Sequence, residues 1–320
     1  MRKALRLIFY ALAALALVVV VLNWTYGRLP GEPKPQGSFV TVDGLRIHYF
    51  ERAGAGTPVV LLHGLPGTAE DWNEVTPLLS GHRTIAIDRP GFGYSSGGYV
   101  KFGRQVEIVD DVLRRLHVAR PILVGHSYGG TIALAFAERY PSEPRALVLV
   151  DAAAGGTRVG SFEQAQAHAV KFLQLPVIHQ ISNVTFGQLL DTVSVDMTDG
   201  KAFHPQPVAT AHRHRVLAIN VQSGNLEAYS GEELEANGVF DRIDPRLGSI
   251  RVPAVVIQGE EDKLVKPKYG RKIAATLPDA RLEMVHGGHM APYTHPYAIA
   301  AVVNAVEANL RRAQAATASP

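Results

Sequence analysis

The sequence predicts an α/β protein with a mostly parallel sheet, helices on both faces of that sheet, and a helical cap inserted between two strands. Three observations predict this fold class. Two strand-like segments around Asp43-Gly44 alternate as a hairpin does. Short apolar runs then alternate with helical patterns, which is typical of parallel sheets. Finally, about a hundred residues separate the strand that ends at Asp151 from the strand that begins near Ala254, far more than an ordinary crossover needs.

Eight segments are expected to form the strands, and helical patterns separate most of them. They read SFVTV, LRIHYFERA, PVVLLHG, RTIAID, PILVG, RALVLVD, PAVVIQG and RLEMV. The sheet and its helices should form a core of residues 38–154 and 245–312. Residues 155–244 show helix-like apolar spacing and should form a cap over the carboxyl ends of the strands, where parallel sheets bind ligands. The Ala-rich end, residues 313–320, is expected to be a flexible tail.

The N-terminal segment is typical of a membrane anchor. No charged or strongly polar residue lies between Leu7 and Leu22, and Trp24 and Tyr26 follow as interfacial aromatics would. Such a helix is roughly 30 Å long, enough to cross a bilayer. We therefore expect an anchor at residues 1–26 and a Pro/Gly-rich linker at 27–37. A cleavable signal peptide is the alternative, but its apolar region is usually shorter and ends in a small-x-small site.

Charge and composition exclude several classes of protein. The net charge of +3 is accounted for by Arg2, Lys3 and Arg6, and the rest of the chain is balanced, so nothing indicates a nucleic-acid surface. These basic residues precede the apolar run, which predicts a cytoplasmic N-terminus and places the domain that follows on the extracytoplasmic (periplasmic or extracellular) side. The chain has no cysteine, which excludes disulfides and thiolate chemistry. Apolar and charged contents of 47% and 19% exclude general disorder.

The stretch ILVGHSYGGTIAL places Ser127 in an abrupt turn between a strand and a helix. Such a turn forces one residue into a strained conformation and brings backbones together, so its neighbours must lack side chains. The glycines around Ser127 meet that requirement. We expect the turn to lift the Ser127 hydroxyl clear of the sheet, where it can act as a nucleophile.

A serine nucleophile needs a histidine base and an orienting carboxylate. His289 lies in a Gly-Gly-His turn beyond the last predicted strand and is the expected base; His286, directly after that strand, is the competing candidate. Asp262 follows the strand-ending glycine of VVIQG and is the expected acid. Asp151 is its rival, whereas Glu260 and Glu261 are expected to be solvated. The order Ser127, Asp262, His289 is the one expected for Ser–Asp–His chemistry on a nucleophile elbow.

The oxyanion that forms during acyl transfer needs hydrogen-bond donors. The backbone N–H groups of Leu65 and Tyr128 are the expected pair, and His63 and Gly64 shape the loop that carries Leu65 and are expected to contact substrate. In the cap, Phe172 and Phe186 are candidates for lining the substrate site, although apolar residues of this kind are more often core. We expect no metal site, because His212 and His214 lack further ligands at suitable spacing.

Several segments together resemble the α/β-hydrolase superfamily, in particular its branch of capped serine hydrolases: HGLPG, DRPGFGYS, GHSYGG, GEEDKLV and GGHM. The resemblance extends from about Val40 to Arg311 and is weakest in the cap. It implies an eight-stranded α/β-hydrolase sheet but leaves the substrate open, because the superfamily includes esterases, lipases, C–C bond hydrolases, epoxide hydrolases and haloalkane dehalogenases. The last two groups use an aspartate at the position of Ser127.

These observations predict a membrane-anchored serine hydrolase that forms an acyl-enzyme on Ser127. A small-molecule carboxylic ester or related acyl compound is the expected substrate, and no cofactor is implied. Hydrolysis of a C–C bond in a vinylogous diketone, by the same three residues, is the nearer alternative. A non-catalytic ligand sensor or membrane-tethered binding protein is the more distant one. The oligomeric state is not predicted.

Overall fold

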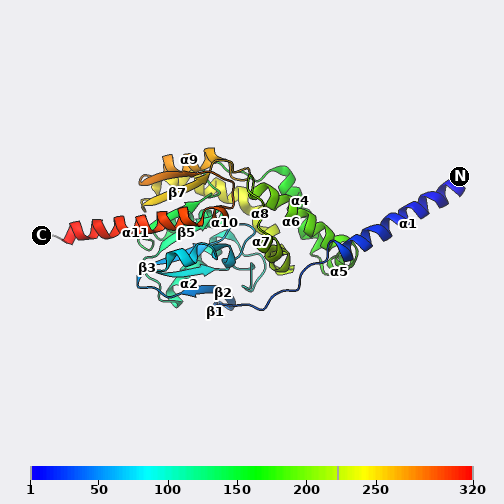
Figure 1. The fold of residues 1–320 in the computed structure, drawn as a ribbon, viewed down its shortest axis with the longest axis horizontal. Coiled ribbons are helices and arrows are strands. Elements are labelled where there is room, and N and C mark those ends of the chain that lie inside the picture. Colours follow the sequence, from blue (N-terminus) through cyan, green and yellow to red (C-terminus); the bar gives the residue numbers. More distant parts are fainter. Residues whose placement is uncertain (1, 222, 319–320) are drawn as a thin grey trace.

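The computed structural model describes residues 2–221 and 223–318, and it contains one eight-stranded sheet in the order β1-β2-β4-β3-β5-β6-β7-β8 (Figure 1). The strands are β1 (Ser38–Val42), β2 (Leu45–Arg52), β3 (Gly56–Leu62), β4 (His82–Ile87), β5 (Ile122–His126), β6 (Ala146–Val150), β7 (Ala254–Gly259) and β8 (Ala280–Val285). β2 pairs antiparallel with β1 and with β4, and all other pairs are parallel. The predicted fold class is therefore confirmed.

Helices cover both faces of the sheet, as the alternating pattern predicts. α2 (Phe102–Arg115), α3 (Tyr128–Arg139) and α9 (Pro267–Thr276) pack with one apolar cluster, and η1 (Ala69–Trp72), η2 (Thr76–Leu79), α10 (Ala291–Thr294) and α11 (Pro296–Ala318) pack with the other. Every residue of β5 and β6 is buried, because helices lie above and below these central strands. The core thus holds the ends of β5, β7 and β8 at one rigid edge.

The long connection between β6 and β7 is helical. It contains α4 (Ser161–Leu173), α5 (Pro176–Ser182), η3 (Asn183–Gly187), α6 (Gln188–Ala202), α7 (Thr210–Arg215), η4 (Val216–Asn220) and α8 (Ser223–Ile243), followed by η5 (Asp244–Ser249). We call α4 to α8 the cap. Figure 1 shows these helices gathered at one end of the sheet, between the core and the N-terminal helix.

A helix lies at each end of the described part of the chain. α1 (Arg2–Thr25) is long and apolar enough to cross a membrane, and it extends away from the molecule on the cap side (Figure 1). At the other end, α11 continues through Ala318. Residues 313–318, expected to belong to a flexible tail, thus continue the helix, which the Ala-rich sequence favours; residues 319 and 320 lie outside the described part of the chain.

Candidate active site

Ser127 lies between the last residue of β5 and the first residue of α3, with backbone angles φ 51° and ψ −118°. The glycines around it are required by close packing. A Cβ on Gly129 would lie 2.3 Å from the carbonyl oxygen of Leu62, and a Cβ on Gly130 would lie 2.5 Å from Cβ of Ala152. The carbonyl oxygen of Ser127 also accepts the N–H of Ala153 at 3.0 Å. The strained turn is thus held from both sides.

His289 and Asp262 meet at the carboxyl edge of the sheet. His289 Nδ1 donates to Asp262 Oδ2 at 2.7 Å, and Asp262 Oδ1 accepts the N–H groups of Leu264 and Val265 at 2.8 and 2.9 Å. Because a carboxylate can only accept, the neutral imidazole carries its proton on Nδ1 and leaves Nε2 free to accept one. The backbone N–H of His289 donates to Ala202 O of the cap at 2.8 Å, so the cap helps to position this loop.

The electrostatic surroundings of His289 favour its protonated form. Burial alone lowers the pKa of His289, but the charge and hydrogen bond of Asp262 raise that pKa above its ordinary value of 6.5. The neighbouring His126 behaves in the opposite way: burial and the adjacent His289 lower the pKa of His126 to about 3. His126 Nε2 donates to the carbonyl oxygen of His289 at 2.8 Å, which makes His126 a neutral support for the loop.

The competing candidates occupy different positions. His286 is exposed, with 78% of its side chain accessible, and it pairs with Glu261 at 2.8 Å instead of facing Ser127. Asp151 is fully buried, and its Oδ1 accepts the N–H of Gly259 at 2.7 Å. Burial and the nearby Asp262 raise the pKa of Asp151 well above its ordinary value, which favours a neutral carboxyl group.

The loop after β3 lies against the nucleophile. A Cβ on Gly64 would lie 3.1 Å from Cβ of Ser127, closer than most Cβ contacts, so glycine suits this close approach. His63 was expected to contact substrate, but its imidazole is fully buried: Nδ1 donates to Gly64 O at 2.9 Å, and Nε2 accepts the N–H of Arg89 at 2.9 Å. Burial and Arg89 lower the pKa of His63 well below 6.5. The His63 side chain therefore shapes the loop and does not face a ligand.

A buried network of hydrogen bonds around Arg89 and Glu232, which we call the Arg89–Glu232 clasp, joins this loop to the cap. The sequence did not reveal it. The Arg89 guanidinium donates to Gly64 O at 2.7 Å, to Gln105 Oε1 at 2.8 Å and to both carboxylate oxygens of Glu232 at 2.7 and 2.8 Å. Arg89 follows β4, whereas Glu232 lies on α8. The only sequence signal for this clasp is an arginine in the loop DRPGFG, and nothing in the cap sequence distinguishes Glu232 from a solvated glutamate.

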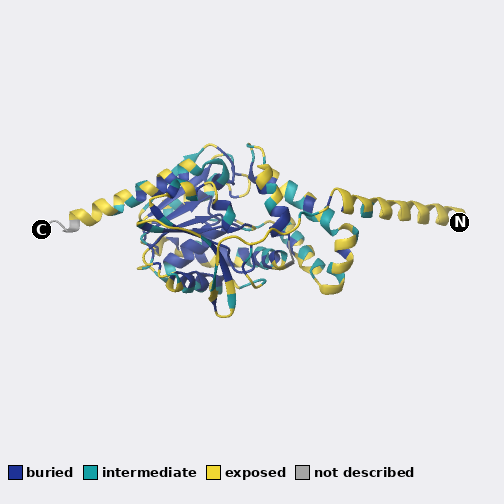
Figure 2. Ribbon diagram, turned by 60° about the horizontal axis from the view of Figure 1, so that its bottom comes forward, coloured by how far each residue is buried: buried dark blue, intermediate teal, exposed yellow. Residues whose placement is uncertain are grey.

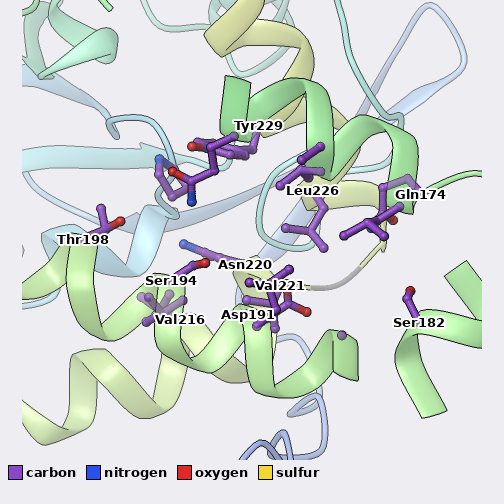
Figure 3. A pocket seen from close by; sticks show the side chains of 18 of the residues that line it. Gln174, Ser182, Asp191, Ser194, Thr198, Val216, Asn220, Val221, Leu226 and Tyr229 are labelled. Carbon is purple, nitrogen blue, oxygen red and sulfur yellow. The ribbon is translucent and has the colours of Figure 1, made fainter. Parts of the chain in front are cut away.

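A cavity of about 210 Å³ lies inside the cap and meets the loop after β3 at Pro66. Helices α4, α6 and α8 supply most of its wall, and Figure 3 shows Asp191, Asn220 and Tyr229 on it. Among the described residues that line it there is no lysine or arginine. Burial raises the pKa of Asp191 to about 7. Phe172 and Phe186 do not line this cavity and are 57% and 39% exposed, so their expected contact with substrate is not supported here.

Comparison with known proteins identifies the class. The family model described as "alpha/beta hydrolase fold" matches residues 57–296, and the chain belongs to this family of hydrolases. The 2-hydroxy-6-oxononadienedioate/2-hydroxy-6-oxononatrienedioate hydrolase of Burkholderia vietnamiensis is 30% identical over 80% of this chain and 89% of the relative. The 2-hydroxy-6-oxo-6-phenylhexa-2,4-dienoate hydrolase of Burkholderia cepacia is 29% identical over 80% of this chain and 91% of the relative.

Solved structures share the fold at lower sequence identity. A bacterial membrane phospholipase A superposes with a TM-score of 0.68 at 22% identity, covering 97% of this chain and 99% of that chain. At this level of identity the similarity concerns the fold alone.

Proposed function

We propose that this chain is a serine hydrolase that acts through an acyl-enzyme on Ser127. In this mechanism, Ser127 Oγ attacks a substrate carbonyl while His289 Nε2 takes its proton, and Asp262 stabilises the resulting imidazolium. The N–H groups of Leu65 and Tyr128 would stabilise the oxyanion. His289 then protonates the leaving group, and water resolves the acyl-enzyme by the same steps. The observation that carries the proposal is the 2.7 Å hydrogen bond between His289 and Asp262 beside the Ser127 turn.

The names of the relatives favour C–C bond hydrolysis over the ester hydrolysis expected first from the sequence. Their named substrates are carbon chains bearing keto and hydroxyl groups and carboxylates, with no ester bond. Hydrolysis of such a chain must break a C–C bond. Ser127 would then attack the ketone, and the carbon leaving group would receive its proton from His289. Cleavage of a C–C bond next to a ketone is therefore the first candidate.

Ester hydrolysis remains the second candidate because of the charge of the cavity. The relatives' named substrates are carboxylates, and a buried carboxylate needs a cationic partner. The described cavity wall has no lysine or arginine and contains Asp191. This lining supports an uncharged substrate group in the cap, whichever bond is broken.

We further propose that α1 is an uncleaved membrane anchor and that the catalytic domain lies on the extracytoplasmic side. The length and apolar character of α1 support the anchor. The three basic residues that precede its apolar run support the orientation.

Ser127→Ala tests the catalytic proposal. Turnover of p-nitrophenyl esters and of vinylogous diketones should fall by about 10⁶-fold, because the acyl-enzyme cannot form. Ser249→Ala, which changes an exposed serine of η5, should leave both activities unchanged. A fluorophosphonate probe should label Ser127, as mass spectrometry of the peptide would show. Full activity of Ser127→Ala, or an adduct on another residue, would overturn the assignment. The ratio of the two activities identifies the bond.

A further inference from the structure

The cap exposes large apolar side chains over its outer helices. We define the cap face as the exposed apolar residues of α4 to α6: Phe162, Phe172, Leu175, Val177, Ile181, Val184, Phe186, Leu190, Val193 and Met197. Val177 is 69% exposed and Ile181 is 58% exposed. In the described part of the core, by contrast, only Leu264 and Tyr297 are large apolar residues with comparable exposure. Large exposed apolar residues gathered on neighbouring helices often mark an interaction site.

The central part of the cap face also lacks formal charge. No aspartate, glutamate, lysine or arginine lies between Phe172 and Leu190. A helical surface that faces water normally carries a charged side. This segment has none, although it comprises the whole of α5 and η3. Its composition therefore fits contact with hydrocarbon better than contact with water.

The last turn of α1 is bonded to this same segment. Asn23 is fully buried; its Nδ2 donates to Asn183 O at 2.9 Å, and its Oδ1 accepts the N–H of Leu189 at 2.9 Å. Trp24 Nε1 donates to Val184 O at 3.0 Å. A Cβ on Gly27 would lie 2.5 Å from the backbone N of Leu189, so the two segments are in direct contact. If α1 crosses a bilayer, its end fixes η3 at the membrane surface.

The same helices form the wall of the cavity. α5, η3 and the start of α6 contribute His179, Asn183 and Leu190 to the lining, while Val177 and Ile181 of α5 point outward. Figure 2 shows exposed residues continuing from α1 onto these cap helices. The cap face and the cavity are therefore formed by the same helices and share Leu190.

We propose that the cap face lies in the interfacial region of the lipid bilayer and that substrate enters the cavity from the membrane. The substrate would then be an uncharged carbonyl compound that partitions into lipid, such as an acyl ester or ketone with an apolar chain. This inference rests on the proposed anchor and catalytic site, and it adds the route and the physical class of the substrate. The occupant of the cap face is lipid, since α1 places this face at the bilayer.

Fluorescence quenching in lipid vesicles tests the position of the cap face. Because the natural chain has no cysteine, the full-length variants Val177→Cys and Ile181→Cys can each be labelled at one site with an environment-sensitive fluorophore. Spin-labelled lipid should quench both labels, and aqueous iodide should not. Tyr297→Cys, at a 76% exposed position of the core, is the matched control and should show the reverse. The proposal is overturned if iodide quenches the labels introduced at Val177 and Ile181 as strongly as the label introduced at Tyr297. It is also overturned if neither quencher reaches the labels at Val177 and Ile181, because that result indicates that a second copy of the chain covers the cap face.

Activity with two matched substrates tests the route. We expect Val177→Asp/Ile181→Asp to lower kcat/KM for a long-chain ester in vesicles by about tenfold or more, because each buried apolar side chain contributes substantially to lipid binding. Activity on a short water-soluble ester should stay unchanged, since neither residue lines the cavity. An equal loss on both substrates, or no loss on either, overturns the membrane route. If Ser127→Ala keeps its activity, the catalytic proposal fails instead, while the quenching result still decides the position of the cap face.

Discussion

The core and the cap use apolar residues in opposite ways. In the core, β5, β6 and β7 are buried along their whole length, and helices cover both faces of the sheet. In the cap, α4 contains a single buried residue, Ala167, and α5 only Ser182. Both regions show apolar patterns in their sequences. The difference teaches that an apolar pattern identifies a surface that avoids water, but not what covers that surface.

The two regions also differ in how tightly packing constrains them. Gly129 in the core touches the backbone of β3, whereas Gly200 in α6 has nothing within 4 Å of an added Cβ. Between core and cap, α8 makes both polar and apolar contacts. Arg89 and Glu232 form a buried ion pair, Tyr99 OH of the core donates to Glu235 of α8 at 2.8 Å, and Phe240 of α8 packs in the apolar core. The cap is thus attached to the core at α8 and at the end of α6, where Ala202 O accepts the N–H of His289, whereas α4 and α5 are mostly exposed.

The largest expected effect tests the core. Asp262→Asn should lower kcat by about 10⁴-fold, because an amide disfavours the Nδ1–H tautomer of His289 and cannot stabilise the imidazolium. Asp151→Asn is the matched control, since Asp151 is held by the N–H of Gly259 and not by His289. Steady-state kinetics of both variants measure the difference. A greater loss of kcat for Asp151→Asn than for Asp262→Asn would show that Asp151, and not Asp262, supports His289.

The next largest effect concerns the buried ion pair between Arg89 and Glu232, which joins the cap to the core. Glu232→Gln should lower the free energy of unfolding by about 3–5 kcal/mol, because the buried Arg89 charge loses its partner. Asp241→Asn removes the partner of Arg158 in an ion pair whose side chains are 48% and 65% exposed, and should cost about 1 kcal/mol or less. Denaturant unfolding of the two variants provides the measurement. Equal losses would show that the Arg89–Glu232 pair behaves as a surface ion pair.

A smaller effect concerns the pH dependence of kcat/KM, which reports the pKa of His289. Only neutral His289 can accept the proton of Ser127, and the folded-state pKa of His289 lies above 6.5. Below that pKa, kcat/KM should fall about tenfold per pH unit, with the inflection above pH 6.5. In Asp262→Asn, burial remains while the carboxylate is lost, so the inflection should move to lower pH. The pH profile of kcat/KM, measured with an uncharged ester, checks the inflection in the natural protein and in Asp262→Asn. An inflection at the same pH in both proteins would show that Asp262 does not interact with His289.

The smallest expected effect is that of a substitution at Gly200 of the cap, and Gly129 of the core is its contrasting position. Gly200→Ala should raise the free energy of unfolding by about 0.5–1 kcal/mol, because alanine favours helix and meets no neighbour. Gly129→Ala should prevent stable folding, since its Cβ would overlap the carbonyl oxygen of Leu62. Thermal unfolding followed by circular dichroism gives both results. A well-folded Gly129→Ala protein would show that the turn at Ser127 can relax.

The site residues expected from the sequence fall into two groups, those set by position along the chain and those that depend on side-chain direction. Ser127 could be located from its glycines, and Asp262 and His289 from their places after predicted strands, because the strands of a parallel sheet bring their carboxyl ends to one edge. The expected roles of His63, Phe172 and Phe186 depended on side-chain direction, which a sequence does not contain. His63 turns into the loop, and the two phenylalanines are exposed. The Arg89–Glu232 clasp joins residues far apart in sequence and left no local pattern.

The sequence by itself determined the order of strands and helices, the tight turn at Ser127 and the apolar N-terminal helix, because short-range sterics and hydrophobic periodicity set these features within a few residues. Only the tertiary structure decided which histidine contacts Asp262, which side of the cap faces outward and where α1 meets the cap. Those outcomes depend on long-range packing and hydrogen bonds, such as those of Asn23 with Asn183 and Leu189. Apolar helices of the same composition can bury themselves against protein or lipid, and only their neighbours in space distinguish the two.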